Sequence, residues 1–348
     1  MTDKPISKFD FTQSFLDKPG PQFKASDYII APGLRKAVEV AILLKQPLLL
    51  TGEPGTGKTR LAEKLAADLY ESHPKDYLSQ PLIFHTKTIS SYSDLFYIYD
   101  ALSHFHDAHL SGDGQSTREG PLQPSKYIQL QAFGQALILS DPKSAEAPPY
   151  RLTNDVVSDE TFKFDGLGAR SSVVLIDEVD KAPRDFTNDL LNELDRFEFS
   201  VKEDGNRRFK KGSKNIFLIL TSNSEKNLPE AFLRRCIFYH IEFPKPEQLQ
   251  EIVMNQLRQQ LSEATDMEME RINGRLSEYI TLFSTKLRNS SADKRPATAE
   301  LITWIFYLID DIRADRAITD ISRDKLIASY SIIAKEKNEL ARLTGLFA

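Results

Sequence analysis

The segment GEPGTGKT at residues 52–59 constrains the fold more than any other feature of the chain. It follows the short apolar run LLLT and precedes KTRLAEKLAADLY, in which Leu61, Leu65 and Leu69 recur at helical spacing. A glycine-rich loop between a buried strand and a helix lets backbone N–H groups surround phosphate oxygens at the helix N-terminus. The segment therefore predicts a phosphate-binding loop on a strand–loop–helix unit.

The residues of this loop have separate predicted roles. Lys58 is expected to reach the terminal phosphates of a nucleotide, and Thr59 to bind Mg²⁺ through its hydroxyl. Gly52, Gly55 and Gly57 allow a backbone path that a Cβ atom would obstruct. The predicted nucleotide-binding residues of the segment are Gly52, Glu53, Pro54, Gly55, Thr56, Gly57, Lys58, Thr59 and Arg60.

A second strand with an acidic end, VVLIDE at residues 173–178, complements the loop. Asp177 closes an apolar run, where a carboxylate can hold Mg²⁺ beside the phosphates. Glu178 is then the expected general base, which would orient and activate the attacking water. Two solvated strand-end charges are the simpler alternative, but the loop and this strand corroborate each other. Together they predict hydrolysis rather than binding alone.

The remaining pattern predicts an α/β protein. Apolar runs at 81–88, 173–177 and 215–223 suit a parallel sheet covered on both faces by helices, a three-layer αβα core. The polar stretches 111–126 and 140–160 are expected to be inserted loops around a short helix near 126–139. After 243–246 only helical periodicity remains. The predicted domains are an N-terminal extension, 1–27, a nucleotide-binding domain, 28–244, and a smaller all-helical lid domain, 245–348.

Composition limits the cellular setting and the partners. No run approaches the roughly 20 apolar residues of a membrane span. The first residues, MTDKPISKFDF, include acidic residues and have no apolar stretch typical of a signal peptide, so a cytoplasmic protein is expected. The single cysteine, Cys236, cannot form an internal disulfide and is expected to be buried. A formal net charge of -5 argues against a chain that coats nucleic acid over its whole surface.

With these motifs in place the chain resembles the AAA+ ATPases of the P-loop NTPase class, and within them the MoxR-like group. The resemblance extends from about Tyr28 onward. The phosphate-binding (Walker A) and acidic-strand (Walker B) motifs are specific only to the wider class. The narrower resemblance is carried by LIDEVDKAPRDFTNDLLNELDRFEF, ILTSNSEKNLPEAFLRRC and SDLFYIYDALSHFHDA.

The resemblance implies further site residues. Asn223 occupies the sensor-1 position at the end of the NIFLILTSN strand, where it would hold the attacking water or the γ-phosphate. Arg235, rather than the neighbouring Arg234, occupies the position of an arginine finger that acts on the next subunit's nucleotide. Arg295 is the candidate for sensor 2, although it precedes the proline of KRPATAEL, whereas the usual arginine follows it.

The resemblance also implies ATP with Mg²⁺ as cofactor and a homo-oligomer, expected to be a hexameric ring. Tyr28 and Ile29 could line the base pocket. The expected function is chaperone-like remodelling of a protein client, and the resemblance implies a von Willebrand factor A-type partner protein. The alternative is a nucleic-acid-directed motor similar to McrB, which could use GTP.

Three weaker signals have simpler readings as well. His104, His106 and His109 could suggest a metal cluster, but a solvated helix is the preferred interpretation, and no metal beyond Mg²⁺ is predicted. The basic segment GNRRFKKGSK at 205–214 could contact an acidic client or nucleic acid, or form a plain charged hairpin. The aromatic segment at 91–102 could contact a client or pack on the sheet edge.

Overall fold

The computed structural model describes residues 23–112, 123–141, 150–152, 168–224, 228–261, 263–290 and 295–345. Its contacts separate Tyr28–Phe243 from a second unit that comprises Met1–Asp27 and Pro244–Ala348. Asp27 accepts hydrogen bonds from the Gln256 and Gln259 side chains, the first at 3.0 Å. The described end of the predicted N-terminal extension, residues 23–27, therefore packs with the helical unit.

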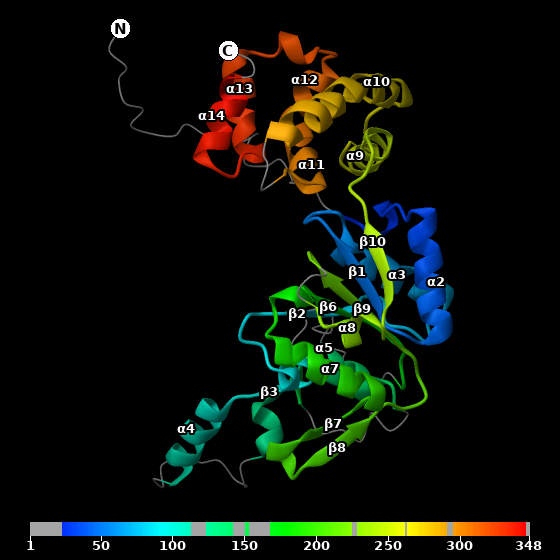
Figure 1. The fold of residues 1–348 in the computed structure, drawn as a ribbon, viewed down its shortest axis with the longest axis vertical. Coiled ribbons are helices and arrows are strands. Elements are labelled where there is room, and N and C mark those ends of the chain that lie inside the picture. The colour runs from blue at the N-terminus through cyan, green and yellow to red at the C-terminus, as the bar shows by residue number, and fades with distance from the viewer. Residues whose placement is uncertain are drawn as a thin grey trace. The chain divides into compact units, whose positions relative to one another are not determined.

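A five-stranded parallel sheet forms the centre of the larger unit (Figure 1). Its strands lie in the order β10-β1-β9-β6-β2. Their bounds are β1 Leu48–Gly52, β2 Leu82–His85, β6 Ser172–Asp177, β9 Ile216–Ser222 and β10 Ile237–Ile241. The predicted α/β class and parallel sheet are confirmed. Because all five strands are parallel, their carboxyl ends meet at one edge.

Successive side chains along a strand point to opposite faces of the sheet, so each face has its own hydrophobic core. Leu48 and Leu50 point to the cluster formed by α2 (Pro32–Leu44) and α3 (Lys58–Ser72). Leu49 points to the opposite cluster, which α5 (Ala132–Leu139) and α7 (Arg184–Arg196) cover. The apolar runs are thus apolar on both faces because each face packs against helices, as a three-layer αβα core requires.

An insert between β2 and β6 carries a second small sheet. Its strands are β3 (Tyr97–Tyr99), β4 (Ile128–Leu130) and β5 (Arg151–Leu152), in the order β3-β4-β5. The helix α4 (Ala101–Gly112) extends from its edge (Figure 1). The short helix predicted near 126–139 is present as α5, which begins only at Ala132; the 3-10 helix η3 (Pro124–Tyr127) and β4 occupy the first part of that stretch. Of the predicted loops 111–126 and 140–160, residues 113–122, 142–149 and 153–160 lie outside the described residues.

A β-hairpin made of β7 (Glu198–Val201) and β8 (Arg207–Lys210) packs against this insert. The hydroxyl of Tyr97 donates to Glu203 at 2.9 Å, and that of Tyr150 donates to Asp204 at 2.7 Å. Both acceptors belong to the 3-10 turn η7 (Lys202–Asp204) of the hairpin. The ring of Phe199 on β7 also stacks on Phe96 of the insert, with centroids 5.0 Å apart. Two segments far apart in the sequence are therefore joined by polar and aromatic contacts.

The second unit is helical throughout its described residues. Its helices are α9 (Pro246–Gln260), α10 (Asp266–Leu282), α11 (Thr298–Tyr307), α12 (Ile309–Arg313), α13 (Arg323–Ile333) and α14 (Lys337–Gly345). Trp304 and Tyr279 are fully buried, with ring centroids 5.9 Å apart, and form the centre of its core. Among the described residues no helix is both long and apolar enough to cross a membrane.

Candidate functional site

The carboxyl edge of the central sheet gathers the predicted site residues. The phosphate-binding loop follows β1, Asn223 follows β9, and Asp177 ends β6. Since β9 lies between β1 and β6, these three strand ends are neighbours in space. Residues separated by more than a hundred positions in the sequence therefore meet at one point, where ligands of parallel sheets commonly bind.

Lys58, the first residue of α3, is held by three oxygen acceptors. Its Nζ donates to the carbonyl oxygens of Gly52 at 2.8 Å and Glu53 at 2.9 Å. The third bond, 2.9 Å long, goes to Oδ1 of Asn223. Burial lowers the pKa of Lys58, while nearby carboxylates, of which Asp177 acts most strongly, oppose that shift. The predicted phosphate ligand and the predicted sensor are thus in direct contact.

Thr59 and Asp177 form a pair of oxygens suited to Mg²⁺. The Thr59 hydroxyl lies 3.2 Å and 3.3 Å from the two carboxylate oxygens of Asp177. Neighbouring oxygens of an octahedral Mg²⁺ site lie about 2.9 Å apart, because the metal–oxygen distance is about 2.0–2.1 Å. A hydroxyl and a carboxylate are also the hard donors that Mg²⁺ selects. The residues present therefore fit the predicted ion.

Thr221, in β9, links the two acidic residues and was missed by the sequence prediction. Its buried hydroxyl donates to Asp177 Oδ1 and accepts the backbone N–H of Glu178 at 2.9 Å. The signal was present as a polar residue two positions before Asn223 in an otherwise apolar strand. Only the pairing of β9 with β6 shows what it bonds.

Glu178 leaves β6 in a left-handed conformation, with φ 57° and ψ 49°. This conformation is uncommon for a residue with a side chain, and such residues gather at functional sites. The Glu178 carboxylate forms an ion pair with Lys181 in the following turn, and this contact raises the pKa of Lys181. The backbone N–H of Asn223 donates to Asp180 at 3.2 Å, which joins the same turn to β9.

A histidine that the sequence prediction also missed lies beside Asp177. His85 ends β2 directly across from Asp177 in the strand register, and its Nδ1 is 3.4 Å from Asp177 Oδ2. The side chain is mostly exposed. The imidazole of His85 therefore lies at the sheet edge beside the predicted groups.

At two positions of the loop a side chain would also collide with a neighbouring residue. Gly52 has φ 146°, and a Cβ there would lie 2.5 Å from the carbonyl oxygen of Ile241. Gly57 has φ 85°, and its Cβ would lie 2.9 Å from the Tyr28 ring. Tyr28 thus packs against the loop, and burial raises its pKa. Ile29 beside it is partly exposed.

The side chains of the other predicted loop residues lie in different surroundings. The Thr56 hydroxyl donates to the Glu53 carbonyl at 2.9 Å, which closes the loop on itself. Arg60 forms a 2.8 Å ion pair with Glu63 on the exposed side of α3. Pro54 and Gly55 are exposed at the loop tip.

Arg235 is not part of this cluster. In the register of β1 with β10, Leu48 lies beside Ile237, so Arg235 lies beyond the amino ends of the strands. The length of β1 alone separates that edge from Gly52 by about 13 Å, at 3.3 Å per residue. An arginine side chain cannot span this distance to its own subunit's phosphates. Arg295 lies in the helical unit just before α11, where it is exposed.

Comparison with known proteins identifies the family. The sequence model described as AAA domain (dynein-related subfamily) matches residues 47–236, which is more than half of the 348-residue chain. The chain belongs to this AAA family. A search of curated proteins found no match. Among solved structures, domain III of the Thermotoga maritima replication initiation protein DnaA aligns with a TM-score of 0.40 and 13% identity, over 91% of this chain and 100% of that one.

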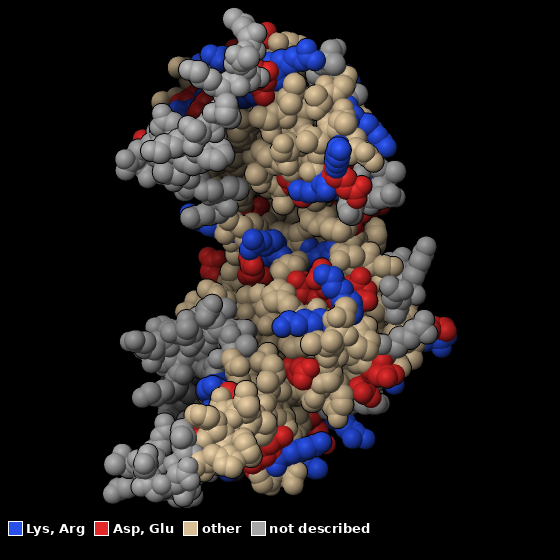
Figure 2. Space-filling model, turned by 90° about the vertical axis from the view of Figure 1, so that its left-hand side faces the viewer, with Lys and Arg blue, Asp and Glu red and all other residues tan. Residues whose placement is uncertain are grey.

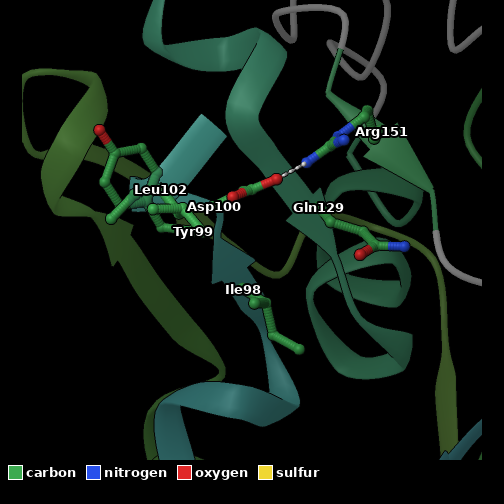
Figure 3. A pocket seen from close by; sticks show the side chains of 7 residues that line it. Ile98, Tyr99, Asp100, Leu102, Gln129 and Arg151 are labelled. Atoms are coloured by element: carbon green, nitrogen blue, oxygen red, sulfur yellow. Dashed lines mark ion pairs between the residues drawn. The ribbon is translucent and has the colours of Figure 1, made fainter. Parts of the chain in front are cut away.

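The AAA domain also has a pocket that is lined by residues of the insert. This pocket of about 520 Å³ lies on the outer face of the β3-β4-β5 sheet (Figure 3). Ile98, Gln129 and Arg151 occupy the same register position on the three strands, and Arg151 pairs with Asp100 at 3.6 Å. The pocket is lined by Ile98, Tyr99, Asp100, Ala101, Leu102, Gln129 and Arg151.

Two of the three histidines of α4 in the AAA domain contact aromatic groups, and His106 Nδ1 lies 3.8 Å from Asp107 Oδ1. His104 bonds to the Tyr99 hydroxyl and stacks on Tyr127 with centroids 4.5 Å apart. His109 lies edge-on to Phe105, 4.2 Å between centroids. Within the described ranges, no three His, Cys, Asp or Glu side chains converge in a way that could hold a metal ion. The helix reading of this segment thus accounts for its contacts.

Proposed function

We propose that this AAA protein is a MoxR-like ATPase that hydrolyses ATP with Mg²⁺. The observation that carries the proposal is the contact between Lys58 and Asn223 beside the Thr59–Asp177 pair. A phosphate ligand, a metal-binding pair and a polar group for the γ-phosphate therefore lie within one hydrogen-bonded cluster. Simple nucleotide binding has no need of the last group.

In this proposal each residue has one task. Lys58 exchanges its carbonyl and amide acceptors for β- and γ-phosphate oxygens, and Asn223 orients the attacking water. Glu178 accepts the proton of that water as its oxygen approaches the γ-phosphorus. Mg²⁺, when bound by Thr59 and Asp177, supplies positive charge to the phosphate oxygens. The left-handed turn at Glu178 directs its side chain away from the line of β6.

Assembly follows from the position of Arg235 at the opposite edge of the sheet. We infer that Arg235 completes the nucleotide site of a neighbouring copy, since its own site is out of reach. A residue that acts on the next subunit requires a head-to-tail contact, and a ring is the closed form of such an assembly. A hexamer, a protein client and a von Willebrand factor A-type partner are the MoxR-like expectations. Arg295 is proposed as the sensor of the lid.

The nucleic-acid-directed alternative rests on the basic hairpin and has weaker support. Arg207 pairs with Asp204 at 2.9 Å, and Lys214 pairs with Asp76. Arg208 and Lys210 are exposed on β8. On the face drawn in Figure 2, Lys and Arg lie interspersed with Asp and Glu rather than in one basic field. Stimulation of hydrolysis by DNA, lost on changing Arg208 and Lys210 to Gln, would favour the alternative.

The proposed function is tested with two variants of the same site. Lys58→Ala is expected to weaken ATP binding, whereas Glu178→Gln is expected to bind ATP and to lose turnover. Binding of a fluorescent ATP analogue and steady-state phosphate release measure the two effects separately. Equal turnover by wild type and Glu178→Gln would refute the base assignment. Mixing Arg235→Ala with Lys58→Ala subunits should restore activity at mixed interfaces, and no recovery at any ratio would contradict the role in trans.

A further inference from the structure

The C-terminal end of α2 exposes an unusual run of apolar side chains. Val40, Ile42, Leu43 and Leu44 are 42%, 41%, 80% and 55% exposed. Single exposed apolar residues are common on protein surfaces, but four within five consecutive positions form a patch of the kind that a partner covers. The buried face of the same helix, which includes Leu34, Val38 and Ala41, already packs on the sheet. The four residues of the exposed run belong to neither hydrophobic core cluster among the residues that the structure describes.

This patch, which we call the α2 patch (residues 40–44), lies at the same sheet edge as Arg235. The chain turns after α2 and enters β1 at Leu48, and the carbonyl of Pro47 accepts the backbone N–H of Ile237 at 2.8 Å. The amino end of β10 and the end of α2 therefore adjoin. Figure 1 shows the lower end of α2 and the short helix α8 (Glu230–Leu233) at this edge of the sheet. Arg235 lies two residues beyond the end of α8.

The two edges of the sheet differ in charge. The carboxyl edge gathers carboxylates close enough to Lys58 to act on its pKa, namely Asp177, Asp180, Glu178 and Glu53. The opposite edge carries Lys45, Lys211, Arg234 and Arg235, of which Arg234 pairs with Glu230. Lys45 is near enough to Lys211 to lower its pKa, in addition to the effect of burial. A head-to-tail contact between copies would bring opposite charges together and favour that orientation.

We propose that the α2 patch is the apolar contact through which a second copy of this chain seats its nucleotide edge against Arg235. The inference rests on the proposed function, because the partner copy is the one whose site Arg235 completes. The apolar side chains of the α2 patch would be buried by the second copy beside Arg235. The charge difference between the two sheet edges favours a head-to-tail contact over a symmetric contact between like edges. Truncating or charging the patch therefore weakens assembly without altering the loop of the same subunit.

The test compares two leucines of equal exposure. Leu43 in the patch and Leu102 on α4 are both 80% exposed, so Leu43→Glu and Leu102→Glu add the same charge to equally accessible sites. Assembly is measured by sedimentation velocity with MgATP in the Glu178→Gln background, where nucleotide is retained. Leu43→Glu is expected to weaken self-association by about 10- to 100-fold, because burial of one leucine side chain is lost. Leu102→Glu should assemble like its parent.

A second measurement does not depend on a destabilising charge. Cys236 is buried, so thiol labelling of Leu43→Cys and Leu102→Cys reports the introduced cysteines. Assembly should slow labelling of Leu43→Cys about tenfold or more and leave Leu102→Cys unchanged. Equal labelling of Leu43→Cys in monomer and assembly, or normal assembly of Leu43→Glu, would overturn the interface.

The outcomes also separate this inference from the proposed function. Binding of a fluorescent ATP analogue to monomeric Leu43→Glu should match wild type, since the patch lies at the edge opposite to the loop. If wild type hydrolyses ATP and assembles while Leu43→Glu assembles equally, only the interface is wrong. If wild type neither hydrolyses ATP nor assembles, the proposed function itself has failed.

Discussion

Replacing Thr221 by valine tests how the acidic pair is held, because valine keeps the shape and removes only the hydroxyl. In wild type this buried hydroxyl donates to Asp177 and accepts the N–H of Glu178. Thr221→Val leaves the Glu178 N–H without its acceptor and removes one donor from the Asp177 carboxylate. Losing a bond to a charged group and stranding a part-buried N–H costs about 2–4 kcal/mol.

The expected result of Thr221→Val is a lower melting temperature and a lower turnover. For a domain of this size about 2–4 kcal/mol corresponds to about 4–16 °C, which differential scanning calorimetry measures. Removing an outer partner of a metal-binding carboxylate should lower kcat about 10- to 100-fold in a phosphate-release assay. Nucleotide binding should fall less, because Lys58 and the loop remain.

Two neighbouring variants serve as controls. Thr221→Ser restores the hydroxyl and should recover both stability and kcat. Ser222→Ala removes a hydroxyl from the same strand that donates to the Ser224 carbonyl at 2.7 Å, so it should cost about 1 kcal/mol and leave kcat unchanged. The reasoning is refuted if Thr221→Val melts and turns over like wild type, or if Thr221→Ser is as impaired as Thr221→Val.

Three further predictions concern other parts of the chain. Gly52→Ala should abolish tight ATP binding in the fluorescent-nucleotide assay, because its Cβ meets the Ile241 carbonyl. Gly205 has φ 65° and open space around it, so Gly205→Ala should lower the free energy of unfolding by about 1–2 kcal/mol and bind the nucleotide normally. Burial raises the pKa of Cys236 to about 12, so alkylation of this thiol at pH 8 should be about 10³-fold slower in the folded than in the unfolded chain. For the same reason the free energy of unfolding should fall as the pH rises above 9. Fast labelling of the native protein would contradict this prediction. Ser329→Ala removes the acceptor of the buried Trp304 N–H, 2.9 Å away, and should destabilise the helical unit by about 1–3 kcal/mol. Fluorescence of Trp304, the sole tryptophan, measures the unfolding curve, and an unchanged curve would exclude this contribution.

The buried strands were predictable because each is apolar on both faces. The strand β10, IFYHI, was missed because it lies at the sheet edge and exposes alternate residues, including Phe238. Strands of two or three residues in the insert carry too little periodicity to be recognised. The strand order β10-β1-β9-β6-β2 is not the chain order, so no local pattern indicates it.

The candidate site likewise contains residues that local sequence predicts and residues that only the fold brings together. The loop residues and Asp177 could be predicted from local motifs, because each motif lies within eight consecutive positions. The contacts of Thr221 and His85 depend on which strand pairs with β6, which sequence periodicity does not encode. The separation of Arg235 from its own loop likewise follows only from the register of β10.

The bonds from Tyr97 and Tyr150 to the hairpin turn have a consequence for exchanging segments between related proteins. Deleting residues 198–210 would strand both hydroxyls and uncover the Phe96 ring that Phe199 covers. Deleting the insert would do the same to the hairpin. The insert and the hairpin therefore form one structural unit. A chimera that transplants either segment alone should be poorly soluble, and a chimera that transplants both should fold.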